Sequence, residues 1–299
     1  MLHTPLRASP WLSQAAGADV FLKLESLQPT FSYKLRGATN AVLRLAASTE
    51  QPARVVTASA GNHGRAMAHA CAAAGIPLTV YVPETAPRTK IDAIRASGAE
   101  LRVCGDYDEA ERRAKEHGAR GIAVFISPYA HPDVIAGAGT LALEVLQDLP
   151  NVDVIVAAIG GGGLISGIAL AADGRLEAAG VEVEASAPFT ASLAAGRITT
   201  ITVAESLADG LTGNLDPDSP TFDIVRQKVR RIAVVAEQEL RQAIRDAALH
   251  ERIIVEGAAA AALAAVATRR LDVRGKTVAV VVSGANIDLE KWSEVVTTS

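Results

Sequence analysis

Strand-length apolar runs alternate with helix-length amphipathic stretches through most of the first half of the chain. Runs rich in Val, Ile and Leu predict strands at residues 20–24, 55–58, 78–82, 100–103 and 122–126. A helical pattern extends to about residue 46 and recurs at 65–74, 88–96 and 108–117. Strands separated by helices of this length predict parallel pairing, with helices on both faces of the sheet.

A second series of the same kind follows in the C-terminal half. Helices are predicted at 134–147, 164–172, 238–249 and 258–267, and strands at 152–159, 181–185, 232–235 and 277–282. Residues 189–220 show no readable pattern. The expected fold class is therefore α/β, with two domains of twisted, mostly parallel sheets flanked by helices. A cleft is expected where the carboxyl ends of the strands face each other.

Four consecutive glycines stand between the predicted strand 152–159 and the helix 164–172; they are Gly160, Gly161, Gly162 and Gly163. A strand, a turn without side chains and a helix N-terminus place unpaired backbone N–H groups around a small concavity. The helix dipole adds positive potential there, so a phosphate is the natural ligand. A tight turn alone needs one or two glycines, and a run of four therefore favours a phosphate site.

Nucleotide motifs match this loop only in part. The third glycine of the dinucleotide fingerprint would fall on Ile165 or Ser166. The phosphate loop of nucleotide hydrolases requires a lysine after the glycines, and no lysine follows here. The loop alone leaves the kind of phosphate open.

Composition excludes several classes of protein. The 299 residues are 49% hydrophobic but only 4% aromatic, with a net charge of −4. Basic and acidic residues are intermixed without a basic stripe, which argues against a nucleic-acid partner. The start of the chain lacks a signal-peptide pattern, and the apolar run 258–267 is too short to span a membrane. Cys71 and Cys104 have no partner spacing, so we expect core thiols in a cytoplasmic protein.

Lys34 follows the first strand by only a turn and is surrounded by Phe31, Tyr33 and Leu35. A lysine in this context is either a solvated residue at a helix start or an amine held in an apolar pocket, where it can attack a carbonyl group. The positive end of a helix disfavours an ammonium group, which slightly favours a special role.

The segment 59–64 lies between a predicted strand and a helix and contains Ser59, Gly61, Asn62 and His63. Its backbone N–H groups and the Ser59 hydroxyl are suited to a carboxylate, but a polar turn has the same composition. Ser283 ends the last predicted strand, where a hydroxyl binds a ligand ring or caps the turn. The histidines and cysteines show no metal-binding spacing, and no metal is expected.

Several motifs together resemble the pyridoxal-phosphate-dependent threonine/serine dehydratases, a fold-type II (tryptophan synthase β-like) group. The resemblance runs nearly from end to end and rests on segments in the same order and at similar spacing. They include Lys34-Leu35-Arg36-Gly37-Ala38, Ser59-Ala60-Gly61-Asn62-His63-Gly64, Gly160–Gly163, Glu256-Gly257-Ala258 and Ser283-Gly284-Ala285-Asn286.

The resemblance implies pyridoxal 5'-phosphate as the cofactor, bound in the interdomain cleft. Lys34 would be catalytic and would carry the internal Schiff base, and Tyr33 would flank the cofactor ring. Asn62 would bind the phenolic oxygen and Ser283 would meet the pyridine nitrogen. The phosphate would be held by the glycine run, Gly160–Gly163.

The substrate would be held by its carboxylate on the loop that contains Ser59, Gly61 and His63. By the same resemblance, residues 1–34 and 134–299 would form a large cofactor-binding domain and residues 35–133 a small substrate-loop domain. A homodimer is expected because relatives are commonly dimers.

The implied reaction is β-elimination from a small β-hydroxy amino acid such as L-threonine or L-serine, which yields a 2-oxo acid and ammonia. Alternatives are an amino-acid racemase, a β-replacement enzyme, or a non-catalytic homologue that only binds small molecules. Two departures from the family bear on this choice. Phe31 stands where a small residue is usual, which places the natural substrate in doubt, and Ala60 stands where serine racemases carry a hydroxyl.

Overall fold

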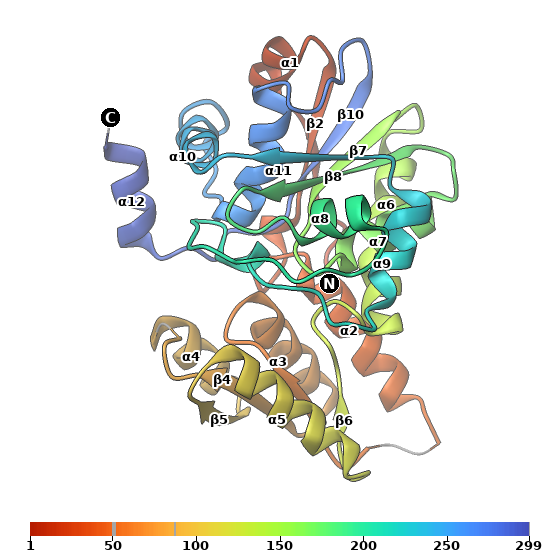
Figure 1. Cartoon of the computed structure of the whole chain (residues 1–299), viewed down its shortest axis with the longest axis vertical. Helices are drawn as coiled ribbons and strands as arrows, with labels where there is room; N and C mark the ends of the chain where they lie inside the picture. Colours follow the sequence, from red (N-terminus) through yellow and green to blue (C-terminus); the bar gives the residue numbers. More distant parts are fainter. Residues whose placement is uncertain (50–51, 87, 299) are drawn as a thin grey trace. The chain divides into compact units, whose positions relative to one another are not determined.

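The computed structural model describes residues 1–49, 52–86 and 88–298; the four remaining positions belong to the expected domains but lie outside the described residues. The chain divides into two compact units (Figure 1). Met1 with Gln28–Ala138 forms one, called the small unit here, and Leu2–Leu27 with Gly139–Ser299 forms the large unit. Lys34 therefore belongs to the same unit as the segment 59–64.

The small unit contains a four-stranded parallel sheet with the strand order β5-β4-β3-β6. Apolar side chains alternate along β3, so that Val55 packs on one face of the sheet and Val56 on the other. Helices α2, α3 and α4 contribute to the first of these cores, and α5 covers the second. The elements are β3 Val55–Ala58, β4 Leu78–Pro83, β5 Glu100–Cys104, β6 Val124–Phe125, α2 Lys34–Ala46, α3 Asn62–Ala74, α4 Arg88–Arg95 and α5 Tyr107–Ala119.

The large unit contains a six-stranded sheet with the order β1-β2-β10-β7-β8-β9, in which only β1 is antiparallel to its neighbour. The strands are β1 Leu6–Ala8, β2 Asp19–Leu24, β7 Val154–Ala158, β8 Glu177–Val183, β9 Arg231–Val235 and β10 Thr277–Val282. Strands β7 and β10 are adjacent and parallel, so the segments that follow them leave the same edge of the sheet.

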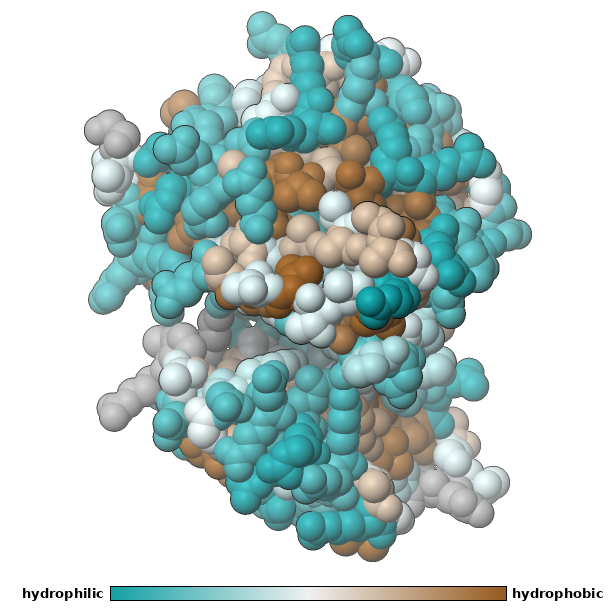
Figure 2. Space-filling model, viewed as in Figure 1, coloured by the Kyte–Doolittle hydropathy of each residue, from teal (hydrophilic) through white to brown (hydrophobic). Residues whose placement is uncertain are grey.

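Helices cover this sheet, and α11 is buried almost all round, as its alanine-rich sequence suggests. The long helix α6 contains the boundary between the two units. Hydrophilic side chains cover most of the visible face of each unit (Figure 2). The helices are α1 Pro10–Ala16, α6 Pro132–Asp148, α7 Gly163–Ala172, α8 Pro188–Ala195, α9 Pro220–Lys228, α10 Glu237–Asp246, α11 Gly257–Ala267 and α12 Leu289–Thr297. None of the described helices is long and apolar enough to cross a membrane.

The predicted α/β class with mostly parallel sheets flanked by helices is confirmed, and several strands have the expected bounds. The strand predicted at 181–185 was misplaced, because β8 begins at Glu177 and ends at Val183. Helices α8 and α9 lie at the two ends of the stretch that showed no pattern. Each is short and begins with a proline, which fits the first turn of a helix but gives little apolar periodicity.

A buried ion pair anchors the N-terminal segment to α6. Lys23 is fully buried, and its Nζ lies 2.7 Å from a Glu144 carboxylate oxygen and donates to the Thr4 carbonyl at 2.7 Å. The Thr4 hydroxyl in turn donates to Glu25 at 2.5 Å. A buried ammonium group requires such partners, so this contact fixes β2 beside the start of the chain.

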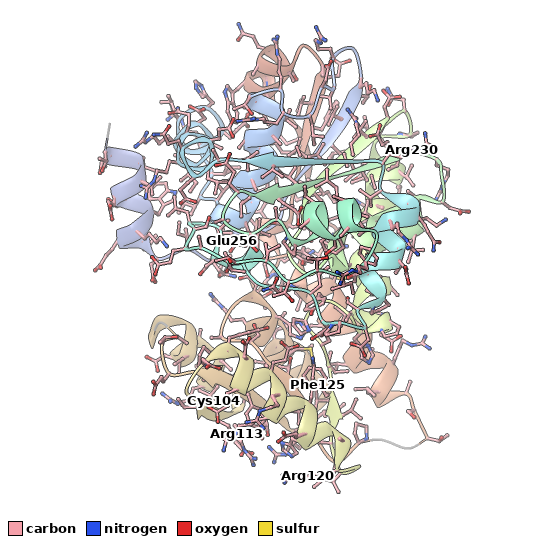
Figure 3. The ribbon with its side chains drawn as sticks, viewed as in Figure 1. Cys104, Arg113, Arg120, Phe125, Arg230 and Glu256 are labelled. Carbon is pink, nitrogen blue, oxygen red and sulfur yellow. The ribbon has the colours of Figure 1, made fainter. Side chains whose placement is uncertain are left out.

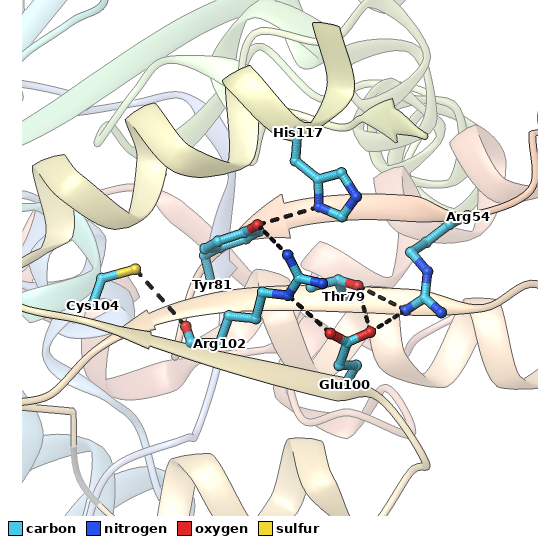
Figure 4. A network of polar contacts seen from close by, with 7 residues as sticks. All are labelled: Arg54, Thr79, Tyr81, Glu100, Arg102, Cys104 and His117. Atoms are coloured by element: carbon cyan, nitrogen blue, oxygen red, sulfur yellow. Dashed lines mark hydrogen bonds and ion pairs between the residues drawn. The ribbon is translucent and has the colours of Figure 1, made fainter. Parts of the chain in front are cut away.

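Charged side chains line the free edge of the small sheet (Figure 4). Glu100 on β5 accepts hydrogen bonds from Arg54 at 2.5 Å and from Arg102 at 2.8 Å. Arg102 also donates to the Tyr81 hydroxyl at 3.1 Å, and that hydroxyl lies 3.2 Å from Nδ1 of His117. Pairs this exposed contribute little to stability, but charges on an edge strand disfavour pairing with a second chain.

The two cysteines are free and buried, as the composition suggested. Cys104 lies on β5, with Nη1 of Arg113 on α5 at 3.8 Å from its sulfur atom; both residues are labelled in Figure 3. Cys71 lies in the core between α3 and the sheet, and burial raises the pKa of its thiol to about 12.

We expect the Cys71 thiol to resist alkylation in the folded protein. At about pH 8 only about one such thiol in ten thousand is ionised, and the thiolate is the reactive form. Peptide mass spectrometry after iodoacetamide treatment should show unmodified Cys71 in the native protein and complete modification in guanidinium chloride. Equal modification under both conditions would contradict the buried position.

Candidate cofactor site

Lys34 is the first residue of α2 and is half-buried. Its Nζ atom donates a hydrogen bond of 2.7 Å to the carbonyl oxygen of Pro128, which follows β6. The same atom lies 5.3 Å from the centroid of the Tyr33 ring. Among the described residues no carboxylate forms an ion pair with this amine. The amine is thus held in one place by a neutral acceptor, which leaves it available for chemistry.

The segment 59–64 connects the carboxyl end of β3 to the N-terminus of α3. The Ser59 hydroxyl accepts a hydrogen bond from the Gly61 N–H at 3.2 Å, and Gly61 is the N-cap of α3. A side chain at Gly64 would place its Cβ 2.1 Å from the Ser59 carbonyl oxygen, so only glycine fits there. No N-cap side chain accepts from the first turn of α3, which begins at Asn62. This helix end is therefore suited to a carboxylate.

His63 is the second residue of α3, and its ring lies in the interior with only 2% of its surface exposed. Burial holds the pKa of this imidazole well below its ordinary value, and the nearby charge of Lys34 lowers the pKa further. The backbone carbonyl of Ile126 raises the pKa of the imidazole and so opposes these two effects. Neither ring nitrogen meets hydrogen-bond geometry with a partner in the described part of the chain. The sequence analysis expected His63 on the loop that binds the substrate carboxylate; the structure places it in the first turn of α3, with its ring buried.

The four glycines connect β7 to α7 in the large unit. Gly162 is the N-cap of α7 with a φ of 86°, in the left-handed region that favours glycine. A Cβ at Gly162 would lie 2.5 Å from Cζ of Phe189 and 2.9 Å from Cβ of Thr221. A Cβ at Gly160 would lie 3.1 Å from the Gly210 carbonyl oxygen. A side chain is therefore excluded at Gly162 and would be tight at Gly160, and the loop leads into the uncapped N-terminus of α7.

Two hydroxyl groups before and within the first turn of α9 support this loop. Thr221 donates a hydrogen bond of 2.8 Å to the carbonyl oxygen of Gly161. The hydroxyl groups of Thr221 and Ser219 lie 2.8 Å apart, and both residues are buried. Because a carbonyl oxygen is held by Thr221, the loop has a defined conformation. The sequence analysis did not identify these residues, although Ser-Pro-Thr before a helix is a recognisable capping pattern.

Ser283 directly follows β10 and is 3% exposed. Glu256, labelled in Figure 3, fixes the turn that begins there. The Glu256 N–H donates to the Gly284 carbonyl at 3.1 Å, and its carboxylate accepts from the Asn286 N–H at 3.0 Å. A Cβ at Gly284 would lie 2.5 Å from this carboxylate. Because β10 neighbours β7, Ser283 and the glycine loop leave the same edge of one sheet.

Each unit carries features that suit one part of a phosphorylated carbonyl cofactor. In the large unit, a loop without side chains at an uncapped helix N-terminus is able to hold a phosphate group, and a neutral hydroxyl leaves the neighbouring strand. In the small unit, Lys34 offers an amine that pairs with no carboxylate in the described part of the chain. Among the described residues, no group of three or more His, Cys, Asp or Glu side chains is arranged to hold a metal ion.

Comparison with known proteins identifies the cofactor class. A family model described as pyridoxal-phosphate dependent enzyme matches residues 2–284. The chain belongs to this family of pyridoxal-phosphate dependent enzymes. The expected cofactor, pyridoxal phosphate, is thereby confirmed.

Named relatives in this family include eliminating enzymes and a racemase. The chain is 39% identical to an L-threonine ammonia-lyase of Thermotoga maritima, covering 98% of this chain and 74% of that protein. It is 37% identical to a serine racemase of Mus musculus, covering 96% and 87%. Among solved structures, the processed form of threonine deaminase isoform 2 from Solanum lycopersicum has a TM-score of 0.89 and 30% identity, covering 98% and 87%.

The predicted site residues of this pyridoxal-phosphate dependent enzyme fall into two sets. Within the small unit the structure gathers Lys34, Tyr33, Ser59, Gly61, Asn62 and His63, because β3 and β6 are neighbours and α2 packs against α3. Within the large unit it gathers the glycine run and Ser283. Sequence analysis did not single out Pro128, Thr221 or the role of Glu256, since each acts through a partner distant in the sequence.

Substitution of Gly162 should weaken cofactor binding. Gly162→Ala adds a Cβ that clashes with Phe189 and Thr221, and we expect the affinity for pyridoxal phosphate to fall about tenfold or more. Gly174→Ala is the matched control, since Gly174 has a φ of 79° with nothing within 4 Å of the added Cβ. Titration of apoenzyme followed by visible absorbance measures both affinities. Equal losses in the two variants would contradict a role for this loop.

The buried His63 should make stability depend on pH. The unfolded state takes up a proton on this residue as the pH falls through about 6.5, while the folded state does not. This stability is fully present above that pH and is lost below it, by about 1.4 kcal/mol per pH unit. Denaturant unfolding at several values between pH 7 and 5 gives the free energy of unfolding as a function of pH. This free energy should fall less steeply with decreasing pH for His63→Gln than for wild type. The exposed histidine of the same helix provides the control, and His69→Gln should keep the wild-type slope.

Proposed function

We propose that this enzyme is an ammonia-lyase that converts a small β-hydroxy amino acid, such as L-threonine or L-serine, to a 2-oxo acid and ammonia. The observation that supports this most directly is that one unit contains both the Lys34 amine and the uncapped N-terminus of α3. A base and a carboxylate-binding helix end are what Cα deprotonation of an amino acid requires. Relatives named L-threonine ammonia-lyase, at 39–40% identity over nearly the whole chain, support the same reaction.

Each group has a role in this proposal. The segment 59–61 and the first turn of α3, at Asn62, would bind the substrate carboxylate and orient Cα. Bound pyridoxal phosphate supplies a conjugated ring that accepts electron density from the Cα–H bond. Lys34 would hold the cofactor and then take the Cα proton on its Nζ atom. The glycine loop would hold the phosphate, Tyr33 would flank the ring and Asn62 would meet its phenolic oxygen.

The neutral hydroxyl of Ser283 in the large unit favours elimination. Ser283 presents a neutral hydroxyl to the pyridine nitrogen in this proposal, and a neutral group does not keep that nitrogen protonated as a carboxylate would. Loss of the Cα proton and of the Cβ hydroxyl as water leaves an enamine. Water then hydrolyses the enamine to a 2-oxo acid and ammonia, which balances the atoms of the reaction.

Racemisation is the second candidate, because a serine racemase is among the relatives. A racemase needs an acid on the face of Cα opposite to the lysine. Ala60 provides no hydroxyl at the position where the family resemblance would place that acid. We therefore expect elimination to dominate, and chiral analysis of recovered L-serine should show little D-serine compared with the pyruvate formed.

The proposal extends to the oligomeric state, the cellular compartment and the class of ligand. We infer a cytoplasmic homodimer that acts on a small amino acid and not on nucleic acid. A net charge of −4 without a basic stripe favours a small-molecule substrate over nucleic acid. Two buried free thiols fit a reducing compartment. Light scattering after size-exclusion chromatography tests the dimer.

Removal of the Lys34 amine tests the proposal. We expect Lys34→Ala to lose at least about a thousandfold in ammonia release from L-threonine, because it removes the proposed base and the point of cofactor attachment. Borohydride reduction of the wild-type holoenzyme should attach the cofactor to Lys34, as peptide mapping would show. Lys291→Ala, at an exposed lysine of α12, is the control and should retain full activity. Attachment to a different lysine would refute the assignment.

A further inference from the structure

Phe31 has a backbone conformation that a bulky residue rarely adopts. Its φ is 57°, in the left-handed region where Cβ comes too close to the backbone. Its N–H donates to the Gln28 carbonyl at 2.7 Å, so the conformation belongs to a defined turn. Glycine would form this turn without that steric cost.

The position of Phe31 distinguishes it from the other non-glycine residues with positive φ among the described residues. Asp173 and Arg252 are C-caps, and Arg269 directly follows the C-cap of α11. The left-handed conformation is usual at a helix C-terminus, where it satisfies the last carbonyl groups. Phe31 instead precedes a helix, three residues before Lys34.

Burial does not offset the cost at Phe31, because the residue is 51% exposed. A phenylalanine normally stabilises a fold by burying most of its large apolar surface. Here a strained backbone carries an aromatic ring that the core does not use. Strain retained without a gain in packing is typical of functional sites.

The ring lies near a side chain of the first turn of α3. The guanidinium carbon of Arg65, in the first turn of α3, lies 6.0 Å from the centroid of the Phe31 ring, within cation–π range. Phe31 therefore bridges two segments of the small unit, the turn that leads to Lys34 and the helix that begins at Asn62. Those two segments hold the proposed base and the proposed carboxylate site.

We propose that the Phe31 ring limits the size of the substrate side chain, so that the enzyme favours small amino acids over bulkier ones. The inference rests on the proposed function for its placement of the substrate. An amino acid held by its carboxylate at α3 and by its Cα near Lys34 would lie between the two segments that Phe31 bridges, so its side chain would approach the ring. The ring occupies space that glycine at this position would leave open.

The test compares Phe31→Gly with Phe31→Tyr in the holoenzyme. Phe31→Gly removes the ring and suits the turn, whereas Phe31→Tyr keeps the ring. Dissociation constants for L-alanine, L-leucine and L-phenylalanine are measured from changes in cofactor absorbance, which requires no turnover. The relative kcat/KM for 3-phenylserine and L-serine is measured in parallel. Tyr107→Ala, which removes another exposed aromatic residue of the small unit, is the matched control.

For Phe31→Gly we expect the preference for L-alanine over L-phenylalanine to fall about tenfold or more, and the relative kcat/KM for 3-phenylserine to rise by a similar factor. Phe31→Tyr and Tyr107→Ala should remain within about twofold of wild type. The midpoint of thermal unfolding of Phe31→Gly should be no lower than that of wild type, because the turn is relieved of strain.

A binding preference that stays within about twofold of wild type in Phe31→Gly would overturn the proposal. Failure of the proposed function would look different. In that case the wild-type enzyme would release no 2-oxo acid from any hydroxy amino acid, while the binding preferences would still show whether Phe31 selects by size.

Discussion

In the first turns of α3 and α7, no N-cap side chain accepts a hydrogen bond from the backbone N–H groups. The proposed binding of both anionic groups depends on these N–H groups. In each unit the chain leaves a buried parallel strand and enters a helix through a glycine N-cap, Gly61 in one and Gly162 in the other. These N–H groups and the helix dipole require an acceptor, and an anionic ligand provides one. In the proposed function the backbone would therefore recognise the substrate carboxylate and the cofactor phosphate, and side chains would serve mainly to keep that backbone accessible.

Steric constraints maintain the two loops. Gly64 has no room for a side chain because the Ser59 carbonyl oxygen would lie 2.1 Å from a Cβ, and Gly162 is restricted in the same way by Phe189. Polar contacts add definition in the large unit, since Thr221 holds the Gly161 carbonyl in the glycine loop and Glu256 holds the Asn286 N–H in the turn after β10. The glycine loop is thus fixed by close packing and by a partly buried hydrogen bond, which lowers the cost of ordering it around a ligand.

The charges around Lys34 are compatible with the proposed role of its amine as a base. Its acceptor is the neutral Pro128 carbonyl, and burial holds the pKa of the nearby His63 imidazole well below its ordinary value. A neutral imidazole adds no positive charge beside the amine. Stability is given up for this arrangement, since a buried histidine weakens the fold at low pH and the strained turn at Phe31 gains little from packing.

The sequence by itself determined the α/β class, the bounds of β3 and β10, and the glycine loop, because buried parallel strands are continuous runs of Val, Ile and Ala between turn residues. It also singled out Lys34 and Ser283, since each sits at a junction between elements. Tertiary structure alone decided that β8 begins at Glu177, where Arg231 and Lys276 pair with its carboxylate, and that the His63 ring faces the interior. The contacts of Lys34 with Pro128 and of Thr221 with Gly161 likewise join residues 94 and 60 positions apart. Local periodicity records which face of an element is apolar, whereas the partner across the core is set only when the elements pack.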